Sequence, residues 1–328
     1  MRRRGTDREG MALLTVLLLV AVMSVVAVAI LDDVRFSVRR TTNVEFQSQA
    51  QWYAAGAENL ARGQIARQLA VGPARTPLEP AWNGRSMTFP VDSGTITATV
   101  TDGQACFNLN SLALGVGEDL TARPLGAAQF RALGRAVGAP DSRMRAIADA
   151  LTDWLDADTT PLPLGAEDGA YAGLAAPYRT GGAMLAEVSE LRAVKGVDAG
   201  TYRQLRPFLC ALPTSRLSPL NVNTLTLEQA PLLTMLTSGT VGPEQARAVI
   251  AARPRDGWPD AAAFWAQPGL AAVQVDLEAR DQITVLTRFF DLRIDVELGG
   301  SHAVRTALLE AGSDGRVRTV IQRWTPEE

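Results

Sequence analysis

The sequence predicts an α+β fold in which a long N-terminal helix packs on an antiparallel sheet, and in which a large helical insert interrupts the sheet. No proline occurs between residues 11 and 72, so one helix can extend through that range. Runs of β-type residues occur near residues 86–101 and again after residue 283. The stretch between them has helical periodicity with frequent proline and glycine breaks, which predicts an insert between strands of one sheet.

The long helix begins with a segment that is apolar enough to cross a membrane. The 21 residues from 11 to 31 carry no charge, and as a helix they would span about 31 Å, the thickness of a bilayer core. Four arginines precede the segment, and positive charge beside a span favours the cytoplasmic side. We therefore expect a single span with a cytoplasmic N-terminus and with residues 32–328 on the other side of the membrane.

Three fates of this segment remain open from its residues alone. A secretory signal peptide would be cut at Ala27-Val28-Ala29, but that motif lies inside the apolar run with no polar stretch before it. A signal anchor would be retained whole. The third fate follows from Arg8-Glu9-Gly10-Met11, which resembles the cleavage site of prepilin peptidases because a glycine separates the charged leader from the apolar helix. Cleavage after Gly10 would leave Met11 as the new N-terminus.

The helix is predicted to continue through residues 32–69 and to stop at Gly72-Pro73. The residues predicted to form its buried face recur with the helical period; they are Tyr53, Ala57, Leu60, Ala61, Ile65 and Leu69. One continuous helix is therefore expected to begin in the membrane and to end by packing on a folded domain.

Two groups of predicted strands flank the insert. Ser86–Val91 and Thr95–Thr101 are separated by the turn Asp92-Ser93-Gly94. The second group contains three strands joined by glycine turns: Ile283–Leu298, Ala303–Glu310 and Val317–Trp324. Two strands cannot bury a face alone, so we expect the two groups to pair in one sheet.

The predicted organisation has five segments, whose boundaries follow the changes in periodicity and the glycine and proline breaks. They are a leader at 1–10, a transmembrane helix at 11–31, the periplasmic part of the long helix with the first strands at 32–105, the helical insert at 106–284, and the C-terminal strands at 285–328.

The insert contains an internal repeat. Phe107–Leu112 and Leu220–Leu225 share the order apolar, Asn, apolar, Asn, hydroxyl, Leu, and asparagine in such positions stabilises turns and caps helices. The second copy leads into residues 230–253 and Gly257-Trp258-Pro259, a pattern typical of a helix-hairpin-helix unit, which can bind DNA phosphates. The insert carries 19 acidic and 15 basic side chains, and this net charge of −4 argues against nucleic acid as a partner.

Cys106 and Cys210 are the only cysteines of the chain. Both lie in the part that is expected to face an oxidising compartment, where a disulfide can form. Two unconnected buried thiols are the alternative, because free cysteine is commonly buried.

The acidic segment at residues 149–168 is the strongest candidate for a site. The apolar residues of the helix that leads into it recur at helical spacing and predict its core-facing side; they are Met144, Ile147, Ala148, Leu151, Trp154 and Leu155. Asp149, Asp153 and Asp156 are predicted to lie on the opposite side. Five carboxylates occur between Asp153 and Asp168 with no Lys or Arg among them, so they need a cation or open water.

Calcium suits such a segment because it takes carboxylate and carbonyl oxygens in a flexible geometry. The EF-hand template matches at several positions when Asp156 is counted first, but its sixth position, which requires glycine, is Pro161. The segment is therefore not an EF-hand. A calcium loop of another shape and a solvated acidic loop remain open, and a two-carboxylate catalytic site lacks an accompanying substrate-positioning motif.

Other catalytic signals are weak. His302 is the only histidine and lies in a predicted hairpin turn. The sequence contains no G-x-S-x-G motif and no phosphate-binding loop. We therefore predict that the chain is not an enzyme.

Motifs along almost the whole chain point to one family. They are Arg8-Glu9-Gly10-Met11-Ala12-Leu13-Leu14, Gln51-Trp52-Tyr53-Ala54-Ala55-Gly56-Ala57-Glu58, Cys106-Phe107-Asn108-Leu109-Asn110, Asp153-Trp154-Leu155-Asp156-Ala157-Asp158 with Gly165-Ala166-Glu167-Asp168, Ala176-Pro177-Tyr178-Arg179, Glu190–Gly196 and Pro219–Thr224. With these motifs the chain resembles the K-type minor pseudopilins of type II secretion systems, the general secretion pathway protein K family. The resemblance implies a type IV pilin-like α+β fold with a large all-α insert that is SAM-like or helix-hairpin-helix-like. It also implies cleavage after Gly10 and N-methylation of Met11.

The resemblance further implies a calcium site in the insert. The side-chain ligands that it implies are Asp156, Asp158, Glu167 and Asp168, with carbonyls near Pro163 and Gly165 as further donors. It also implies that Cys106 and Cys210 form a disulfide.

Thr15 indicates which position in a filament such a protein would occupy. After cleavage it would be the fifth residue, where the shaft-forming pilins that resemble this chain carry a glutamate inside the membrane. A carboxylate there needs a partner, which is the N-terminal amine of a neighbouring subunit. A neutral threonine, which can bond back to its own helix, suits a subunit that is added first. A tolerated small polar residue is the alternative interpretation.

The function that the resemblance implies is that of a minor pseudopilin at the tip of a periplasmic pseudopilus. There it would help to start assembly and support export of folded proteins across the outer membrane. The implied partners are the I- and J-type minor pseudopilins, the prepilin peptidase and the inner-membrane secretion platform. The insert of 179 residues would clash with subunits stacked above it in a shaft. The competing hypothesis is a bitopic periplasmic protein of a DNA-uptake system whose helix-hairpin-helix insert binds DNA.

Overall fold

The computed structural model describes residues 6–117 and 119–325, with side chains from residue 11 onward. The first five residues of the predicted leader lie outside the described residues. The chain divides into two compact units. The smaller one consists of Met1–Gly56, Thr88–Thr97 and Asp295–Ala303, and the larger one of Ala57–Met87, Ala98–Ile294 and Val304–Glu328.

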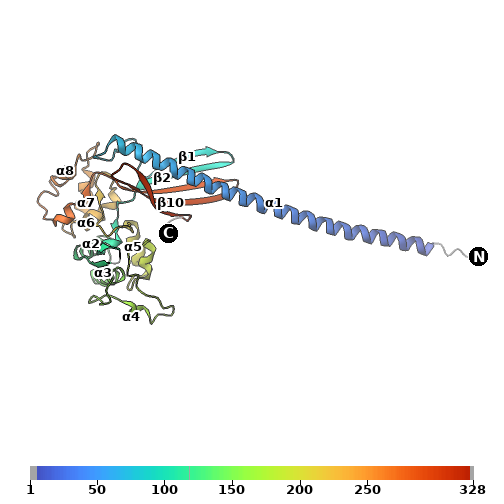
Figure 1. Ribbon diagram of the computed structural model, residues 1–328, viewed down its shortest axis with the longest axis horizontal. Coiled ribbons are helices and arrows are strands. Elements are labelled where there is room, and N and C mark those ends of the chain that lie inside the picture. Colours follow the sequence, from blue (N-terminus) through green and yellow to red (C-terminus); the bar gives the residue numbers. More distant parts are fainter. Residues whose placement is uncertain (1–5, 118, 326–328) are drawn as a thin grey trace, which may run out of the picture. The chain divides into compact units, whose positions relative to one another are not determined.

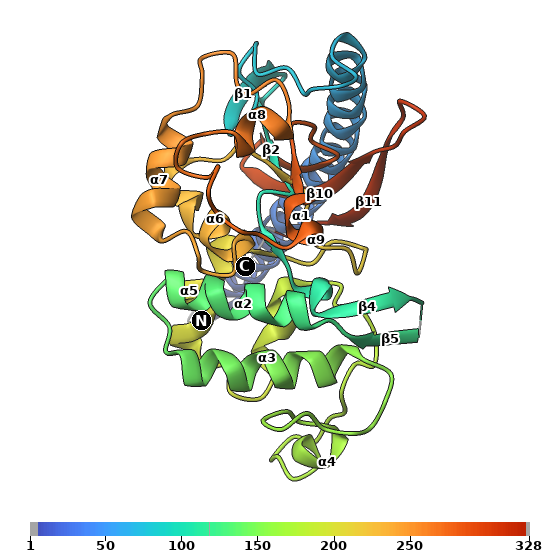
Figure 2. The same ribbon diagram turned by 90° about the vertical axis from the view of Figure 1, so that its left-hand side faces the viewer.

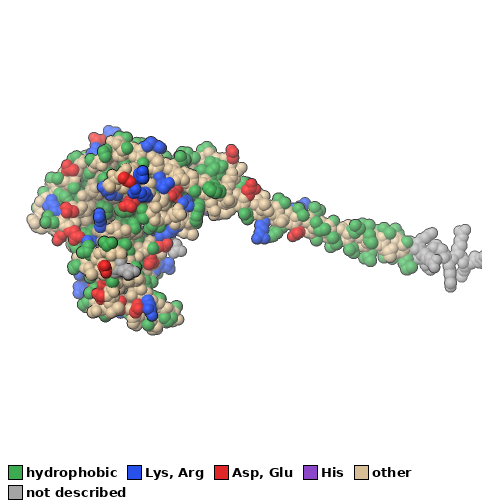
Figure 3. Space-filling view, viewed as in Figure 1, with side chains coloured by type: hydrophobic (Ala, Val, Ile, Leu, Met, Phe, Trp, Pro, Cys, Tyr) green, Lys and Arg blue, Asp and Glu red, His purple; other side chains and the backbone are tan. Residues whose placement is uncertain are grey.

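Helix α1 (Thr6–Val71) is a single α-helix of 66 residues (Figure 1). The N–H of Gly72 donates to the carbonyl of Leu69, and the predicted stop at Gly72-Pro73 is confirmed. The apolar side chains between residues 11 and 31 are exposed and cover this part of the helix (Figure 3). By its length and composition, α1 can cross a membrane.

The buried side of α1 differs from the predicted one. The prediction that Leu60 belongs to it is wrong, because this side chain is 75% exposed. The buried side chains of α1 are those of Ala50, Ala54, Glu58 and Ile65. A search for large apolar side chains at helical spacing does not find two alanines and a glutamate, whose burial depends on contacts made far away in the chain.

A five-stranded sheet has the order β1-β2-β9-β10-β11. Its strands are β1 (Arg85–Val91), β2 (Gly94–Asp102), β9 (Phe289–Leu298), β10 (Ser301–Ala311) and β11 (Val317–Arg323). β2 lies next to β9, so the predicted pairing of the first two strands with the C-terminal meander is confirmed. The turn between β9 and β10 consists of Gly299 and Gly300, whose φ angles of 54° and 84° are accessible to glycine without steric cost.

The predicted strand Ile283–Leu298 is wrong in its first part. Only β8 (Ile283–Thr284) is extended there, and it pairs with β7 (Leu220–Asn221) rather than continuing into β9. The N–H of Thr287 donates to the hydroxyl of Thr76 instead of to a neighbouring strand. Because this N–H bonds to a side chain, the pairing of β8 with β7 does not continue into β9.

The regular secondary structure of the insert between β2 and β9 is mainly helical, and with the sheet it confirms the predicted α+β fold class (Figure 2). Its α-helices are α2 (Pro124–Ala136), α3 (Asp141–Leu155), α4 (Asp168–Tyr171), α5 (Ala199–Leu205), α6 (Ala230–Leu236), α7 (Pro243–Ala251), α8 (Ala261–Trp265) and α9 (Leu277–Arg280). Its 3-10 helices are η1 (Leu109–Leu112), η2 (Val188–Ala193), η3 (Arg206–Phe208) and η4 (Leu227–Gln229). One cluster of buried apolar side chains extends through it, from Ala105 to Val285.

The insert also contains short strands that were not predicted. β3 (Phe107–Asn108) pairs in parallel with β6 (Leu209–Cys210), and β4 (Ala113–Val116) forms an antiparallel hairpin with β5 (Asp119–Ala122). Strands of two to four residues are too short to show a period in the sequence.

The two copies of the internal repeat contain Asn108-x-Asn110 and Asn221-x-Asn223 and are called the Asn-x-Asn copies below. They form the same local structure. In each copy the side-chain oxygen of the first asparagine accepts a hydrogen bond from the backbone N–H of the second, at 3.2 Å in one copy and 3.0 Å in the other. The second asparagine then donates to and accepts from the backbone of one distant residue, which is Leu185 for Asn110 and Trp258 for Asn223. Each copy thereby ties a turn at the start of one part of the insert to a later loop.

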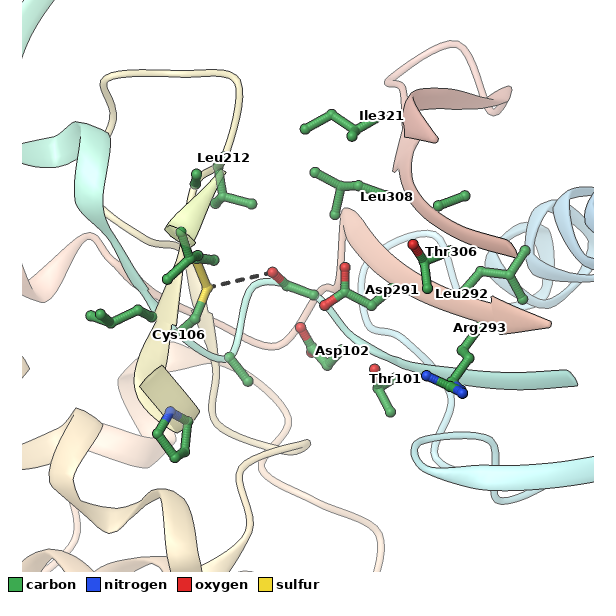
Figure 4. Close-up of a pocket in the computed structure, with 18 of the residues that line it drawn as sticks. Thr101, Asp102, Cys106, Leu212, Asp291, Leu292, Arg293, Thr306, Leu308 and Ile321 are labelled. Carbon is green, nitrogen blue, oxygen red and sulfur yellow. Dashed lines mark hydrogen bonds between the residues drawn. A yellow bond between two sulfur atoms is a disulfide. The ribbon is translucent and has the colours of Figure 1, made fainter. Parts of the chain in front are cut away.

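Cys106 and Cys210 form a disulfide, so the pairing implied by the resemblance is confirmed. It lies beside the short β3–β6 pair, in which Cys210 is opposite Asn108. The disulfide also borders a cavity of about 550 Å³ whose opposite wall is built by side chains from β2, β9, β10 and β11 (Figure 4).

Asp102, at the end of β2, is a buried junction between the sheet and the insert. Its Oδ2 accepts hydrogen bonds of 2.7 Å from the hydroxyls of Thr224 and Thr287, and its Oδ1 accepts one from the N–H of Gln104. Burial raises the pKa of Asp102 to about 6, although these hydrogen bonds act to lower it. No motif in the sequence marks this residue.

Candidate metal centre

The acidic segment lies at the C-terminal end of α3 and in the loop that follows it. The predicted core-facing side chains of this helix are buried; they are Met144, Ile147, Ala148, Leu151, Trp154 and Leu155. The predicted position of the three aspartates on the opposite side of the helix does not leave all of them exposed. Asp153 and Asp156 are 1% and 6% exposed, because the loop 157–167 folds back over this side of the helix.

Asp153 organises this loop. Its carboxylate accepts hydrogen bonds from the backbone N–H of Leu162 at 3.1 Å and from that of Ala166 at 2.6 Å. A Cβ at Gly165 would lie 1.8 Å from Oδ2 of Asp153, so the loop requires glycine at this position. The carboxylate of Asp153 therefore stabilises the backbone of the loop.

Three further carboxylates converge beside the loop. One oxygen each of Asp156, Asp158 and Glu167 lies within 4.8 Å of the other two. Asp156 is buried, Glu167 is half-buried and Asp158 is exposed. Oδ1 of Asp156 and Oε1 of Glu167 are buried and have no hydrogen-bond partner among the described residues. Buried acceptors without donors are costly unless an ion or water binds to them.

The electrostatics of these three carboxylates agree with a bound cation. Burial is the main cause that raises the pKa of Asp156 to about 7, and the neighbouring carboxylates of Asp158, Asp153 and Glu167 contribute. Burial and neighbouring carboxylates also raise the pKa of Glu167. α3 has no basic residue in its last turn, so the negative end of the helix dipole adds to the repulsion.

The donor set fits a hard cation. All three side chains offer carboxylate oxygens, and calcium takes six to eight oxygen ligands in a flexible geometry that carbonyls and water can complete. The two unpartnered buried oxygens are the observation that carries this fit. Asp156, Asp158 and Glu167 would hold the ion.

Asp168, the fourth implied ligand, lies outside this group of three. Its Oδ1 accepts from the N–H and the hydroxyl of Thr180 at 2.9 Å and 3.0 Å, and Nε of Arg179 lies 3.8 Å from its Oδ2. The carbonyl of Gly165, another implied donor, accepts from Nζ of Lys195 at 3.4 Å. The structure thus brings together three of the four implied carboxylates.

Three aromatic side chains support the base of the loop. Trp154 packs edge-on against Tyr171 with ring centroids 5.4 Å apart, and Tyr171 stacks on Tyr178 at 5.1 Å. The hydroxyl of Tyr178 donates to the carbonyl of Ala193 at 2.8 Å. Trp154 and Tyr178 belong to motifs of the family resemblance, which are the signal in the sequence that could have identified them.

The residues of the predicted N-terminal processing site lie on α1. Gly10 and Met11 are both within the helix. The hydroxyl of Thr15 donates to the carbonyl of Ala12 at 2.9 Å, which is the expected bond back to its own helix.

The prediction that His302 lies in a hairpin turn is wrong. It is in β10, and its Nε2 is 3.5 Å from Oδ1 of Asp295. The strand begins earlier than predicted because the two glycines before it are sufficient to reverse the chain.

Known proteins share both the motifs and the fold of this chain. Two protein-family models, both described as "Type II secretion system (T2SS), protein K", match residues 105–214 and 220–285 of the sequence. The chain is 37% identical to the type II secretion system protein K of Pectobacterium carotovorum subsp. carotovorum and 36% identical to that of Aeromonas hydrophila, in each case over 96% of both chains.

A solved structure agrees with these relatives. The crystal structure of the GspK-GspI-GspJ complex from the enterotoxigenic Escherichia coli type 2 secretion system contains a chain that is 33% identical, with a TM-score of 0.77. The match covers 88% of this chain and 99% of that one. The chain therefore belongs to the type II secretion system protein K family.

Proposed function

We propose that the protein is a minor pseudopilin at the tip of the type II secretion pseudopilus. There it helps to start assembly with I- and J-type minor pseudopilins, and it supports export of folded proteins across the outer membrane. The observation that carries this proposal is the long insert within a small sheet: β2 ends at Asp102 and β9 begins at Phe289. Subunits inside a helical shaft have neighbours above and below them. An insert of this size therefore fits best at the end of the filament, where no subunit is stacked above it.

Two further observations support the proposal. A relative was solved in a complex with GspI and GspJ, which supports corresponding partners for this chain. Thr15 is neutral and bonds to its own helix, so it does not require the amine of a preceding subunit. Both properties suit a subunit that is added first.

The apolar part of α1 would serve first as a membrane anchor. The prepilin peptidase would remove residues 1–10 on the cytoplasmic side, and Met11 would then be methylated. The exposed apolar side chains from residue 11 to residue 31 support this role, because they need either lipid or other helices around them. With the inner-membrane platform driving assembly, the same segment would later pack against other subunits.

Calcium would have a structural role in the insert. Bound at Asp156, Asp158 and Glu167, it supplies positive charge to carboxylates that otherwise repel one another. The loop that carries Asp158 and Glu167 would thereby be held against the end of α3. The proposed role of the protein is structural rather than enzymatic.

A DNA-binding role in an uptake system is not favoured. The relatives described above are type II secretion proteins, and the acidic excess of the insert disfavours contact with phosphates along a nucleic acid.

The position of the protein in the filament tests the proposal. Sheared pseudopili are labelled with gold-conjugated antibody against the insert, and an antibody against the major shaft subunit serves as the control. Label at one end of each filament is expected, with the control antibody distributed along the shaft. Insert label distributed along the shaft would exclude a tip position.

A further inference from the structure

Three arginines converge on one aspartate at the beginning of α3. Asp141 is 2.6 Å from Nη1 of Arg135, 3.0 Å from Nη2 of Arg145 and 3.4 Å from Nη2 of Arg131. Two of the arginines come from α2 and one from α3, and these helices lie side by side (Figure 2). Hydrogen bonds from Arg135 and Arg145 lower the pKa of Asp141 to about 2, so this carboxylate is charged at neutral pH.

The charges of this arginine cluster do not balance. Three guanidinium groups face one carboxylate, which gives the cluster a net charge of +2 in an insert whose net charge is −4. Each guanidinium has several N–H donors, whereas Asp141 offers two oxygens. The side chains of Arg131, Arg135 and Arg145 are 32%, 41% and 54% exposed, so each can be reached from solvent.

One donor of the cluster has no acceptor. Nε of Arg131 is buried and has no hydrogen-bond partner among the described residues. A buried N–H without an acceptor is costly, and its neighbour Asp141 already accepts from the Nη atoms. An acceptor from solvent reaches this atom only when the side chain of Arg131 changes its rotamer.

We propose that Arg131, Arg135 and Arg145 form a binding site for a phosphate group, in which the ligand competes with Asp141 for the guanidinium donors. The planar fork of arginine matches the oxygens of a phosphate, which can accept from several donors at once. The net charge of the cluster is opposite to that of the ligand. The phosphate belongs either to a free anion or to an anionic lipid headgroup, which present the same chemistry.

The proposed phosphate site is separate from the carboxylates of the candidate metal centre. Asp141 is the first residue of α3 and Asp156 follows its last residue. With a rise of about 1.5 Å per residue, the two ends of the helix are about 20 Å apart. A substitution at one site is therefore not expected to change the ligands of the other.

The test uses the full chain in micelles of a neutral detergent, with binding measured by calorimetric titration. Inorganic phosphate and glycerophosphoglycerol, the deacylated headgroup of phosphatidylglycerol, are titrated separately at an ionic strength held constant with sodium chloride. Arg145→Gln removes one guanidinium and is expected to weaken binding of the preferred probe about tenfold. Asp141→Asn removes the competing negative charge and is expected to strengthen it about tenfold. Arg247→Gln, on an exposed arginine of α7, is the matched control and should leave the affinity unchanged.

Opposite effects of the two variants would support the proposal, because in a purely structural network both variants would lower the melting temperature without changing any affinity. Tighter binding of inorganic phosphate would identify a free anion as the ligand, and tighter binding of glycerophosphoglycerol would identify a lipid headgroup. The proposal is overturned if neither probe binds the wild type at millimolar concentration. It is also overturned if Arg247→Gln weakens binding as much as Arg145→Gln does.

Discussion

Asp156 is the residue on which the proposed calcium site depends most, because its carboxylate is the most buried of the three. In metal-free protein a buried carboxylate beside two others is unfavourable. With calcium bound, the same negative charge contributes to the affinity. The effect of removing this charge on stability should therefore depend on whether calcium is present.

We expect Asp156→Asn to remove most of the stabilisation by calcium. Calcium at 100 times its Kd would raise the free energy of unfolding of the wild type by about 2.7 kcal/mol. In chelator, the variant should unfold at the same temperature as the wild type or at a higher one, because it lacks the repelled charge. Thermal unfolding of the full chain in calcium and in chelator measures both effects.

The control for this experiment is Glu244→Gln, which makes the same charge change on an exposed part of α7 and should keep the full calcium response. A calcium response of Asp156→Asn as large as that of the wild type would exclude Asp156 as a ligand.

Asp102 predicts a pH dependence of stability that does not involve the metal centre. Its pKa is about 6 in the folded protein, against an ordinary value of 3.8, so the folded state binds this proton more tightly than the unfolded state does. The resulting stabilisation, about 3 kcal/mol, is complete below about pH 4 and is lost as the pH rises through about 6. Asp102→Asn keeps a neutral side chain, so its stability relative to the wild type should increase over this range.

Thermal unfolding of Asp102→Asn and of the wild type at a series of pH values tests this prediction. Stability curves that stay parallel from acidic to neutral pH would mean that Asp102 does not titrate in this range.

The roles of single aspartates could be predicted only in part. Asp156, Asp158 and Glu167, three of the four ligands that the family resemblance implies, come together. Asp153 lies in the same segment, yet its carboxylate accepts backbone N–H groups and shapes the loop. A carboxylate that binds an ion and one that caps a loop have the same residue type and similar spacing. The sequence alone therefore could not separate the two roles.

At the scale of secondary-structure elements, a buried ion pair attaches α1 to the sheet. Oε2 of Glu58 is 2.5 Å from Nε of Arg305 on β10, and the two side chains are 7% and 9% exposed. The hydroxyl of Thr319 on β11 donates to the other oxygen of Glu58, and the ring of Trp324 lies 4.5 Å from the guanidinium carbon of Arg305. Neither charge is tolerated in this position without its partner, so the pair fixes which turn of α1 faces β10.

We expect Glu58→Ala to lower the free energy of unfolding by about 3–5 kcal/mol, because it leaves Arg305 charged and buried without its partner. The double variant Glu58→Met with Arg305→Met replaces both charges by apolar side chains and should recover most of this loss. Thermal unfolding of the full chain compares the two. If the double variant is as unstable as the single one, the loss comes from packing and not from an unpaired charge.

Elements that depend on local hydrogen bonds were predictable, and those that depend on distant ones were not. Each Asn-x-Asn copy bonds within itself, so its turn is recognisable in the sequence. The break before β9 arises because the N–H of Thr287 donates to Thr76, which is 211 residues away. Such a long-range acceptor leaves no local pattern. The apolar residues around the break therefore resemble one continuous strand.

For the whole molecule, the order of the sheet follows from a simple requirement. Strands from both sides of the insert pair with each other, because the two strands before the insert cannot bury a face alone. The two family matches, at residues 105–214 and 220–285, each begin close to one Asn-x-Asn copy. The two copies of the internal repeat in the sequence therefore mark a division of the insert into two parts.

Processing at Gly10 is the property that separates a pseudopilin most directly from a retained anchor or a secreted protein. The precursor carries the same apolar helix in all three cases, so the N-terminus of the mature chain distinguishes them. The measurement is mass spectrometry of the intact protein, purified from the membranes of cells that contain the prepilin peptidase. We predict a chain that begins at N-methylated Met11. An intact Met1, or a chain that begins at Ile30, would contradict the assignment of this protein as a processed pseudopilin.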